Sequence, residues 1–272
     1  MTTNLAQYFD AVIPWDKRLA RELPLLEEVA RRAGRRVLVP ACGTGGHVVA
    51  LAQRGFDVLG FDIDEDTLAI ARGKVAAAAQ AIDAAGGEAR VVHLNMESAA
   101  QLGAAFDAAF CLGNALPGIS GPGQLLAALQ GVAKTLRPGG IFFTQNLNYD
   151  LRWREKTQFF PVLSGATTEE EVLLVKFADY KAEFLNFHAL YLARAKAGGA
   201  WQSHVRSSRQ IPLFRDRLLD LLSQAGFSGL VCWGDYAKTP FDVAKSNDLI
   251  VVAEKAPYRA PERGAGSGMR GS

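Results

Sequence analysis

The sequence contains few cysteines, and they form no pattern. Cys42, Cys111 and Cys232 lie far apart, and no Cys-x-x-Cys pair occurs. A disulfide framework or a zinc site needs cysteines in closely spaced pairs, so neither is expected. We predict that each cysteine is a small buried apolar side chain and that the chain holds no metal.

Long apolar segments are missing as well. No uncharged apolar run approaches the about 20 residues that a membrane-spanning helix requires. The first residues, MTTNLAQYFDAVIPWDKR, include an early aspartate and lack the apolar stretch of a signal peptide. The sequence therefore predicts a cytoplasmic protein without a membrane segment.

The chain also lacks a block of one charge. Its formal net charge is +2, and the tail APYRAPERGAGSGMRGS (256–272), with three arginines and one glutamate, accounts for all of it. A body without net charge or a basic cluster gives no reason to expect nucleic-acid binding. The tail is rich in Gly, Pro and Ser and is predicted to be disordered, and its end, GSGMRGS, resembles the remnant of an expression tag.

The body of the chain alternates short β-rich runs with helical stretches. This order is typical of a parallel sheet covered by helices on both faces. Two late strands follow a further helix, and the short connection between them favours an antiparallel pair. We therefore predict an α/β, Rossmann-like fold with a seven-stranded, mostly parallel sheet. The expected strands are 36–41, 57–62, 89–95, 106–113, 141–148, 230–236 and 247–255, and the expected helices are 46–54, 64–87, 123–136 and 214–226.

Two segments fall outside this alternation. An amphipathic helical arm, residues 1–34, precedes the first strand, and two or three alternating runs within 150–212 indicate a small antiparallel β insertion after strand five. The insertion leaves the carboxyl edge of the sheet, where open α/β sheets bind ligands, so it is placed to act as a lid. The main domain, 35–255, includes this lid, and the tail at 256–272 follows it.

A glycine-rich turn stands between the first strand and the first helix, in VLVPACGTGGH. Gly43, Gly45 and Gly46 allow the backbone to approach a ligand, and the helix start presents free N–H groups. Asp62 ends the second strand, where its carboxylate can accept hydrogen bonds from both ribose hydroxyls. The turn and the acid together predict a ligand that contains adenosine. A dinucleotide and S-adenosylmethionine are the alternatives, although a dinucleotide fingerprint would have glycine in place of Val48.

The stretch VLVPACGTGGHVVALAQRGFDVLGFDIDEDTLAIAR (37–72) closely resembles the first two motifs of class I S-adenosylmethionine-dependent methyltransferases. Later segments, at 106–119, 125–143 and 247–255, are similar to this family in the same order. Within the family, the local sequences CLGNALPGI, NYD and GDYAKTPFD look like those of glycine and sarcosine N-methyltransferases. The resemblance implies S-adenosylmethionine as cofactor and S-adenosylhomocysteine as product.

The resemblance also implies which residues bind the cofactor. The glycine turn would lie under its methionine part, the acid after strand two would bind the ribose, and the residues after strands two and three would contact the adenine. The arginine of WDKRLARE would pair with the cofactor carboxylate, and the end of strand four would line the cofactor beneath the sulfonium. The implied set is Arg18, Ala41, Gly43, Gly45, Gly46, Asp62, Ile63, Asn95, Met96, Glu97, Cys111 and Leu112.

Two positions depart from the family pattern. The family usually has an acid where Val39 stands, and often an aspartate where Asn95 stands. The first change removes a group that usually helps to fix the methionine amino end. Either the affinity is weaker, or another residue takes this role.

Methyl transfer requires no protein nucleophile, because the sulfonium already activates the methyl group. The protein has to hold an acceptor lone pair in line with the S–CH₃ bond and away from water. We predict a small-molecule acceptor, methylated on an amine nitrogen. Transfer to oxygen, a nicotinamide-dependent oxidoreductase and a non-catalytic binding module are the alternatives, and no feature of the sequence specifies an oligomeric state. The candidate catalytic residues are Asn148, Tyr149, His188 and Arg206, with Asn114, Asn146, His204 and Arg209 as further polar side chains of the same region.

Overall fold

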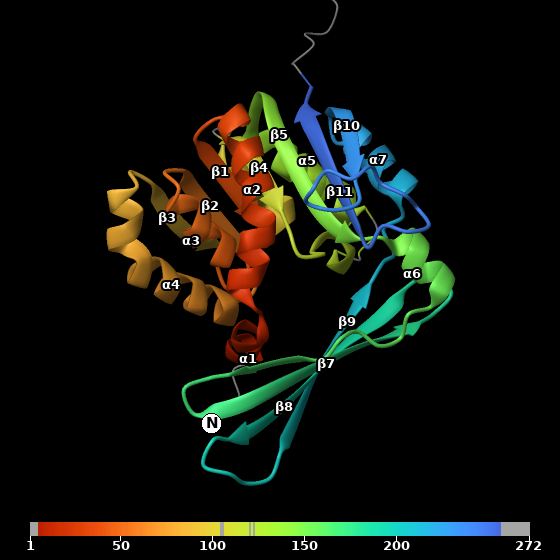
Figure 1. Cartoon of the computed structure of the whole chain (residues 1–272). Helices are drawn as coiled ribbons and strands as arrows, with labels where there is room; N and C mark the ends of the chain where they lie inside the picture. Colours follow the sequence, from red (N-terminus) through yellow and green to blue (C-terminus); the bar gives the residue numbers. More distant parts are fainter. Residues whose placement is uncertain (1–4, 104–105, 120, 122, 257–272) are drawn as a thin grey trace, which may run out of the picture.

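The computed structural model describes residues 5–103, 106–119, 121 and 123–256, and it contains two β-sheets (Figure 1). The larger sheet has seven strands in the order β10-β11-β5-β4-β1-β2-β3. Its neighbours pair in parallel except for β11, which is antiparallel to both β5 and β10. The predicted fold and the predicted antiparallel closing pair are confirmed. The strands are β1 (Arg36–Pro40), β2 (Asp57–Asp62), β3 (Glu88–His93), β4 (Phe106–Cys111), β5 (Leu136–Leu147), β10 (Phe227–Trp233) and β11 (Asp248–Lys255).

Helices cover both faces of this sheet. Because successive side chains of a strand point to opposite faces, Val37 and Phe143 lie on one face of the sheet, which packs against α2, α3 and α4. Leu38 and Phe142 point to the other face, which packs against α5 and α7. Because both faces are buried, the strands read as nearly continuous apolar runs. The helices are α2 (Trp15–Ala33), α3 (Gly46–Ala52), α4 (Glu65–Ala84), α5 (Gln124–Thr135) and α7 (Arg215–Gln224).

The start of β5 differs from the expectation. The strand begins at Leu136, before the RPGG sequence, and not at Ile141. Leu136 pairs with Phe106 and Ile141 pairs with Ala108, so the intervening residues form a bulge on β5. Proline and glycine therefore interrupt the strand without ending it. A short helix that the sequence did not predict, α6 (Tyr149–Glu155), follows the strand.

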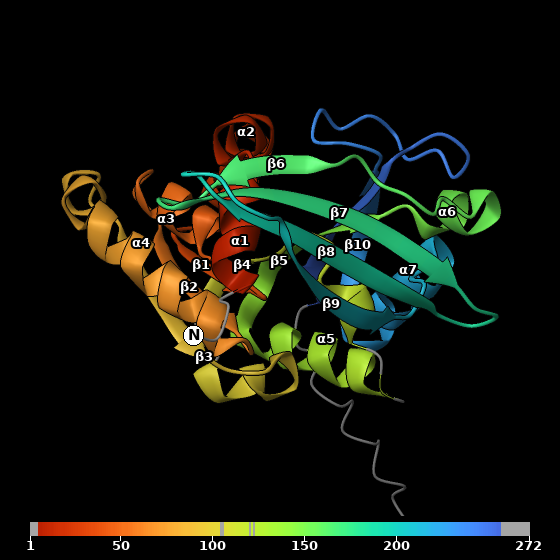
Figure 2. The same ribbon diagram turned by 90° about the horizontal axis from the view of Figure 1, so that it is seen from below.

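The second sheet is the predicted antiparallel insertion. Its four strands have the order β6-β7-β8-β9 and lie between α6 and α7 in the chain. Figure 2 shows this sheet running across the carboxyl edge of the larger sheet. The three predicted runs correspond to β7, β8 and β9, and β6 is an additional edge strand. The strands are β6 (Leu163–Ala166), β7 (Glu170–Tyr180), β8 (Leu185–Ala195) and β9 (Gln202–Gln210).

The N-terminal arm connects the two sheets. It consists of α1 (Leu5–Val12) and α2, separated at Pro14, which lacks an N–H group and disfavours a helical conformation in the residue before it. Tyr8 of α1 belongs to a buried cluster with Val172 of the insertion. Its hydroxyl also donates a hydrogen bond of 2.7 Å to Glu170. The arm thus holds the insertion against the main body of the protein.

Within the described ranges, no helix is long and apolar enough to cross a membrane. The predicted disordered tail, apart from Ala256, lies outside the described residues.

A methyl group at Gly165 is expected to disturb the contact between arm and insertion. A Cβ atom there would lie 2.0 Å from the carbonyl oxygen of Ala11 in α1, and a main-chain atom cannot move aside as a flexible side chain can. We expect Gly165→Ala to lower the free energy of unfolding by about 1–3 kcal/mol in urea denaturation. Gly73→Ala is the control, because a Cβ on this helical glycine meets nothing within 4 Å and should stabilise the helix by up to about 1 kcal/mol. Equal effects of the two substitutions would contradict this account.

Candidate active site

The glycine turn leaves space at the carboxyl end of β1. Gly43 has a φ of +54°, and a Cβ atom there would meet nothing within 4 Å. At Gly45, with a φ of +78°, a Cβ atom would lie 2.8 Å from the side chain of Ala71 in α4. The turn is therefore open at Gly43 and tightly packed at Gly45.

The carboxylate of Asp62 is fixed by two backbone groups. Its Oδ2 accepts a hydrogen bond of 2.9 Å from the N–H of Gly43, and its Oδ1 accepts one of 3.0 Å from the N–H of Asp64. Each oxygen keeps a further lone pair for a ligand. The acid therefore ties the end of β2 to the glycine turn and retains the capacity to bind hydroxyl groups.

A cavity of about 230 Å³ lies beside this turn. Side chains from the ends of β1, β2 and β4 line it, together with side chains from the N-terminal arm. The structure thus brings together five of the residues expected to bind the cofactor, and Val39 lines the same cavity. Those five are Arg18, Ala41, Gly43, Asp62 and Leu112.

Three other expected cofactor residues lie behind the cavity wall. Gly45 packs on α4, and a Cβ atom on Gly46 would lie 2.3 Å from the ring of Trp15. Cys111 is fully buried in β4, where burial raises the pKa of its thiol to about 12. These residues shape the wall from behind and do not line the cavity.

The remaining expected residues lie at the ends of β2 and β3. Ile63 directly follows β2 and is 67 % exposed. Asn95 precedes the short helix η1 (Met96–Leu102), and its side chain accepts the N–H of Ser98 at 2.9 Å, a capping role that asparagine fills as well as aspartate. Met96 is buried and Glu97 is half-buried. The ends of the two strands adjoin, because the N–H of Leu94 donates to the carbonyl of Asp62.

A buried carboxylate on α2 organises the arm side of the cavity. Glu22 is only 2 % exposed and accepts hydrogen bonds from Arg18 at 3.2 Å, Arg21 at 2.8 Å and His47 at 2.7 Å. Burial raises the pKa of Glu22, but the bond from His47 and the charge of Arg18 outweigh it and lower the pKa to about 2. Burial also lowers the pKa of His47, so its neutral ring donates from Nε2. Nothing in the sequence marks Glu22 as a buried residue, because its spacing from Arg18 is that of an ordinary exposed helix pair.

Tyr149 joins the main sheet to the insertion. Its hydroxyl donates to Gln210 of β9 at 2.8 Å and accepts a hydrogen bond of 3.0 Å from Asn114, at the end of β4. Burial raises the pKa of Tyr149 to about 12, although the bond from Asn114 lowers it. The phenol is therefore protonated at neutral pH and held in one orientation.

Two of the other candidate catalytic residues do not reach the cavity. Asn148 is fully buried, where its amide donates to the carbonyl of Ser246 at 2.9 Å and its oxygen caps α6. His188 pairs across the strands with Phe177 and stacks on it at 4.7 Å. Strand alternation places this pair on the face opposite Val172, which packs toward α1. Because successive side chains of a strand point to opposite faces of the sheet, His188 lies on the face away from the site.

Arg206 has yet another setting. Its guanidinium forms an ion pair of 3.0 Å with Asp64, which caps α4 and follows closely on Asp62. The pair connects β9 of the insertion to the end of β2. Arg206 therefore lies at a contact between the insertion and the main body, on the side of the site where the ribose is expected.

Two cations lie near this edge without a carboxylate partner. Lys176 of β7 and Arg152 of α6 form no ion pair within 4 Å with any carboxylate that the structure describes. Burial lowers the pKa of Lys176, and the charges of Arg18 and Arg152 lower it further. The Nε atom of Arg152 is buried without a hydrogen-bond partner among the same residues, and its guanidinium lies 5.1 Å from the ring centre of Phe160. Such cations are costly unless an anion binds them.

Comparison with known proteins gives these features a context. Residues 37–140 match a family model described as a methyltransferase domain. The chain is 25% identical over 258 residues to a glycine/sarcosine N-methyltransferase of Halorhodospira halochloris, an alignment that covers 91% of this chain and 85% of that protein.

Two solved structures share the fold over most of the chain. A S-adenosylmethionine-dependent methyltransferase from Clostridium acetobutylicum ATCC 824 has a TM-score of 0.68 at 14% identity, covering 86% of this chain and 90% of the other. CalS10, an amino pentose methyltransferase from Micromonospora echinaspora solved with its S-adenosylmethionine bound, has a TM-score of 0.61 at 20% identity, covering 89% and 92%. The insertion and the arm are therefore part of an architecture that occurs in other chains.

Replacing the Asp62 carboxylate by an amide should weaken cofactor binding. Asp62→Asn keeps the shape of the side chain but loses the charge that strengthens its hydrogen bonds, so we expect the Kd for S-adenosylhomocysteine to rise by more than about tenfold in calorimetric titration. The exposed Asp66, in the first turn of α4, provides the matched control Asp66→Asn. Unchanged affinity of a folded Asp62 variant would rule out the ribose assignment.

The ion pairs of Glu22 should make stability depend on acid pH. Its folded pKa of about 2 lies below the ordinary 4.5, so its contribution is complete above pH 4.5 and is lost as the pH falls toward 2. The shift corresponds to about 3 kcal/mol. Glu22→Gln should therefore lower the free energy of unfolding by about that amount at pH 7, and the difference from wild type should shrink in acid.

Glu27→Gln is the control for this measurement. Glu27 pairs on the surface with Arg31 and Arg54, and such pairs contribute less than about 1 kcal/mol. A loss at Glu22 that stays constant between pH 7 and pH 2 would show that packing, not charge, is responsible.

Proposed function

Because the chain belongs to the class I S-adenosylmethionine-dependent methyltransferases, we propose that it methylates the amine nitrogen of a small acceptor that also carries an anionic group. S-adenosylhomocysteine would be the second product. The observation that carries the acceptor class is the pair of half-buried cations, Lys176 and Arg152, which have no carboxylate partner among the described residues.

The residues around the cavity suit the cofactor. Asp62 offers its free lone pairs to the ribose hydroxyls, and the open side of the turn at Gly43 leaves room for the chain that follows the ribose. Arg18 lines the same cavity and can receive the methionine carboxylate through its Nη atoms, since its Nε is engaged by Glu22. Ile63 and the start of η1 offer a surface for the adenine.

When bound, the cofactor supplies a methyl group that its sulfonium has already activated. The protein then has to position the acceptor and exclude water. The N-terminal arm contributes Phe9 and Trp15 to the cavity wall, and the insertion is held over the carboxyl edge by the contacts of Tyr8 and Arg206. We propose that arm and insertion together form the lid of the site.

The cations define where the acceptor's anionic group would lie. Lys176 shares the inner face of β7 with Leu174 and Ala178, both of which are buried. Arg18 and Arg152 lie near enough for their charges to lower the pKa of Lys176. A carboxylate placed among these groups would relieve their mutual repulsion and the cost of burial.

An amine nitrogen is favoured over an oxygen by the activities of the relatives and by the base that a hydroxyl acceptor would require. A glycine/sarcosine N-methyltransferase aligns with nearly the whole chain, and glycine itself combines an amine with a carboxylate. A hydroxyl acceptor would need a base to remove its proton at the moment of transfer. The Tyr149 phenol, whose pKa is raised to about 12, is a poor base at neutral pH.

A panel of acceptors with labelled cofactor tests this proposal. Glycine, sarcosine and alanine carry both groups, ethanolamine has the amine without the carboxylate, and glycolate has the carboxylate with a hydroxyl in place of the amine. We expect label transfer to the amino acids in preference to the other two. Lys176→Met should lower kcat/KM for glycine by about 10–100-fold, because a charge-assisted contact is lost.

Lys181→Met is the matched control, since Lys181 lies at the end of the insertion and pairs with Asp179 on the surface. It should leave kcat/KM for glycine nearly unchanged. Methylation of glycolate or ethanolamine at the rate of glycine would refute the acceptor class. An equal loss for charged and uncharged acceptors in Lys176→Met would refute the role of the cations.

A further inference from the structure

Asp248 is a carboxylate at the same edge of the sheet that neither the sequence motifs nor the expected cofactor contacts involve. It begins β11 and lies opposite Leu147, the last residue of β5. Strand alternation places it on the face that packs against α2, the face to which Leu112 of the cofactor cavity also belongs. The fold therefore brings one acid to the part of the edge where the acceptor cations lie.

A single side chain connects Asp248 to the cofactor cavity. Nε2 of Gln145 donates to Oδ1 of Asp248 at 2.8 Å, and Oε1 of Gln145 accepts the N–H of Gly113 at 2.9 Å. Gly113 lines the cofactor cavity. The carboxylate is thus held one amide group away from the cavity wall.

The other oxygen of Asp248 is available to a ligand. No described group is recorded as a hydrogen-bond donor to Oδ2, and Asp248 forms no ion pair within 4 Å in the described part of the chain. Burial raises the pKa of this carboxyl, against the lowering effect of Gln145, Arg21 and Arg152. A half-buried carboxylate with one neutral donor is under-compensated, and a ligand with a positive donor would stabilise it.

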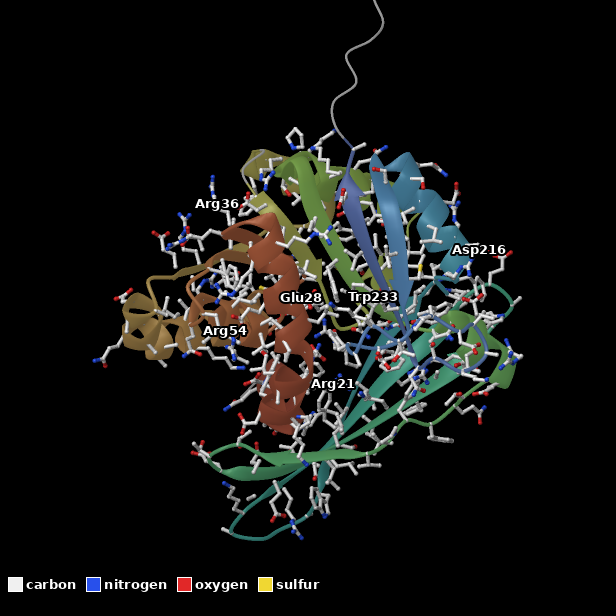
Figure 3. The ribbon with its side chains drawn as sticks, turned by 45° about the horizontal axis from the view of Figure 1, so that its top comes forward. Arg21, Glu28, Arg36, Arg54, Asp216 and Trp233 are labelled. Carbon is white, nitrogen blue, oxygen red and sulfur yellow. The ribbon has the colours of Figure 1, made fainter. Side chains whose placement is uncertain are left out.

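Space for such a ligand lies next to Asp248. A cavity of about 520 Å³ is lined by Arg21 of α2, by Asp248 and by the segment between β10 and β11, including Tyr236. The Tyr236 hydroxyl is buried and has no hydrogen-bond partner among the described residues. In Figure 3, Arg21 lies beside α2 on the side of these strands, whereas Asp216 lies away from them on α7.

From this geometry we propose that Asp248 receives the ammonium group of the acceptor and takes its proton before methyl transfer. The inference rests on the proposed function, because it requires an amine acceptor whose anionic group lies at Lys176 and Arg152. Arg152 influences both Lys176 and Asp248 electrostatically. An amino acid with its carboxylate at the two cations would therefore present its ammonium group toward Asp248.

In the proposed step, Asp248 accepts one proton from the ammonium group before the methyl group moves. One N–H bond of the ammonium breaks and an O–H bond forms on Asp248, which leaves the nitrogen with a free electron pair. That pair forms the new bond to the methyl carbon while the carbon–sulfur bond breaks, and its electrons remain on sulfur. The product is a methylated ammonium and a neutral thioether, and the proton on Asp248 then passes to solvent.

The surrounding charges favour this transfer. Arg18, Lys176 and Arg152 lower the pKa of an ammonium ion bound among them, because like charges disfavour the charged form. Burial has the opposite effect on Asp248 and raises its pKa. The two pKa values therefore move toward one another, which reduces the free-energy cost of moving the proton.

Binding of glycine and acetate separates the ammonium contact from the carboxylate contact. Acetate has the carboxylate of glycine without the ammonium group. Both are titrated calorimetrically into the enzyme saturated with S-adenosylhomocysteine. We expect wild type to bind glycine at least about tenfold more tightly than acetate, and Asp248→Asn to reduce that ratio to within about threefold.

Two further variants complete the design. Asp216→Asn makes the same chemical change at a carboxylate that is 87% exposed and should keep the wild-type ratio. Lys176→Met should weaken both ligands and leave their ratio unchanged. Asparagine at 248 keeps an oxygen for Gln145, and its melting temperature shows whether the variant is folded.

The outcomes distinguish the two proposals. If acetate binds but glycine has no advantage, or if the advantage survives in Asp248→Asn, the role of Asp248 is refuted and the anion site stands. If neither ligand binds wild type, the acceptor class is refuted, and the role of Asp248 with it.

The pH dependence of kcat/KM for glycine gives a readout that a purely structural role would not change. The charged and titratable groups around Asp248 are Arg21 and Glu22 of α2, Arg152 of α6, and Asp235, Tyr236, Asp242 and Lys245 of the segment between β10 and β11. Arginine and tyrosine do not titrate near neutral pH, and Glu22 is ionised there. In Asp248→Asn the acid limb of the profile should move to higher pH, toward the pKa of free glycine. An unmoved limb in the folded variant would contradict proton transfer to Asp248.

Discussion

The position of the N-terminal arm depends on the buried carboxylate of Glu22. A carboxylate that is 2 % exposed remains ionised only if its partners replace the water that it has lost. Arg18 and Arg21 come from its own helix, whereas His47 comes from the start of α3, directly after the glycine turn. The interaction therefore fixes α2 against the turn, and α1 and the insertion that packs on it follow from that position.

The same contact determines the charge of the cavity wall. Glu22 binds Arg18 through Nε and so leaves the Nη atoms free, and it holds His47 as a neutral donor. Val39, which stands where related chains usually have an acid, lies in the same wall. The carboxylate that binds Arg18 and His47 in this wall is thus supplied by a helix of the arm and not by β1.

The sequence was sufficient for the fold because the fold depends on periodic patterns. Strand runs, helix stops and the late antiparallel pair were predicted within a few residues, since each is set by local chemistry and by alternation. The RPGG bulge was not, because its outcome depends on pairing between β4 and β5. For the site, the motif identified Asp62 and Gly43, whose roles are set by the turn in which they lie.

The residues that the sequence analysis missed share one property. Glu22, Lys176, Arg152 and Asp248 are charged residues of the kind that usually lies on a solvated surface, and nothing in their local sequence marks the first as buried or the other three as half-buried. Their environment is created by tertiary contacts: Lys176 lies on the face of the insertion that packs toward α1, and β11 brings Asp248 beside β5. His188 shows the same dependence on tertiary structure, because the register of β8 places its side chain on the outer face of the insertion.

These charged residues determine the electrostatic environment of the proposed acceptor. In the proposed reaction, methyl transfer would move positive charge from sulfur to nitrogen, so the total charge near Lys176 and Arg152 would hardly change during the step itself. A protonated acceptor beside a sulfonium holds two positive charges close together in a site of low dielectric. The cations therefore raise the free energy of that state more than they raise the free energy of the transfer step. Removing the proton first relieves that repulsion. An acid at Asp248, near Arg152 and outside the cofactor cavity, can receive this proton without approaching the sulfonium. Preorganised charges of this kind select the neutral amine before the methyl group moves.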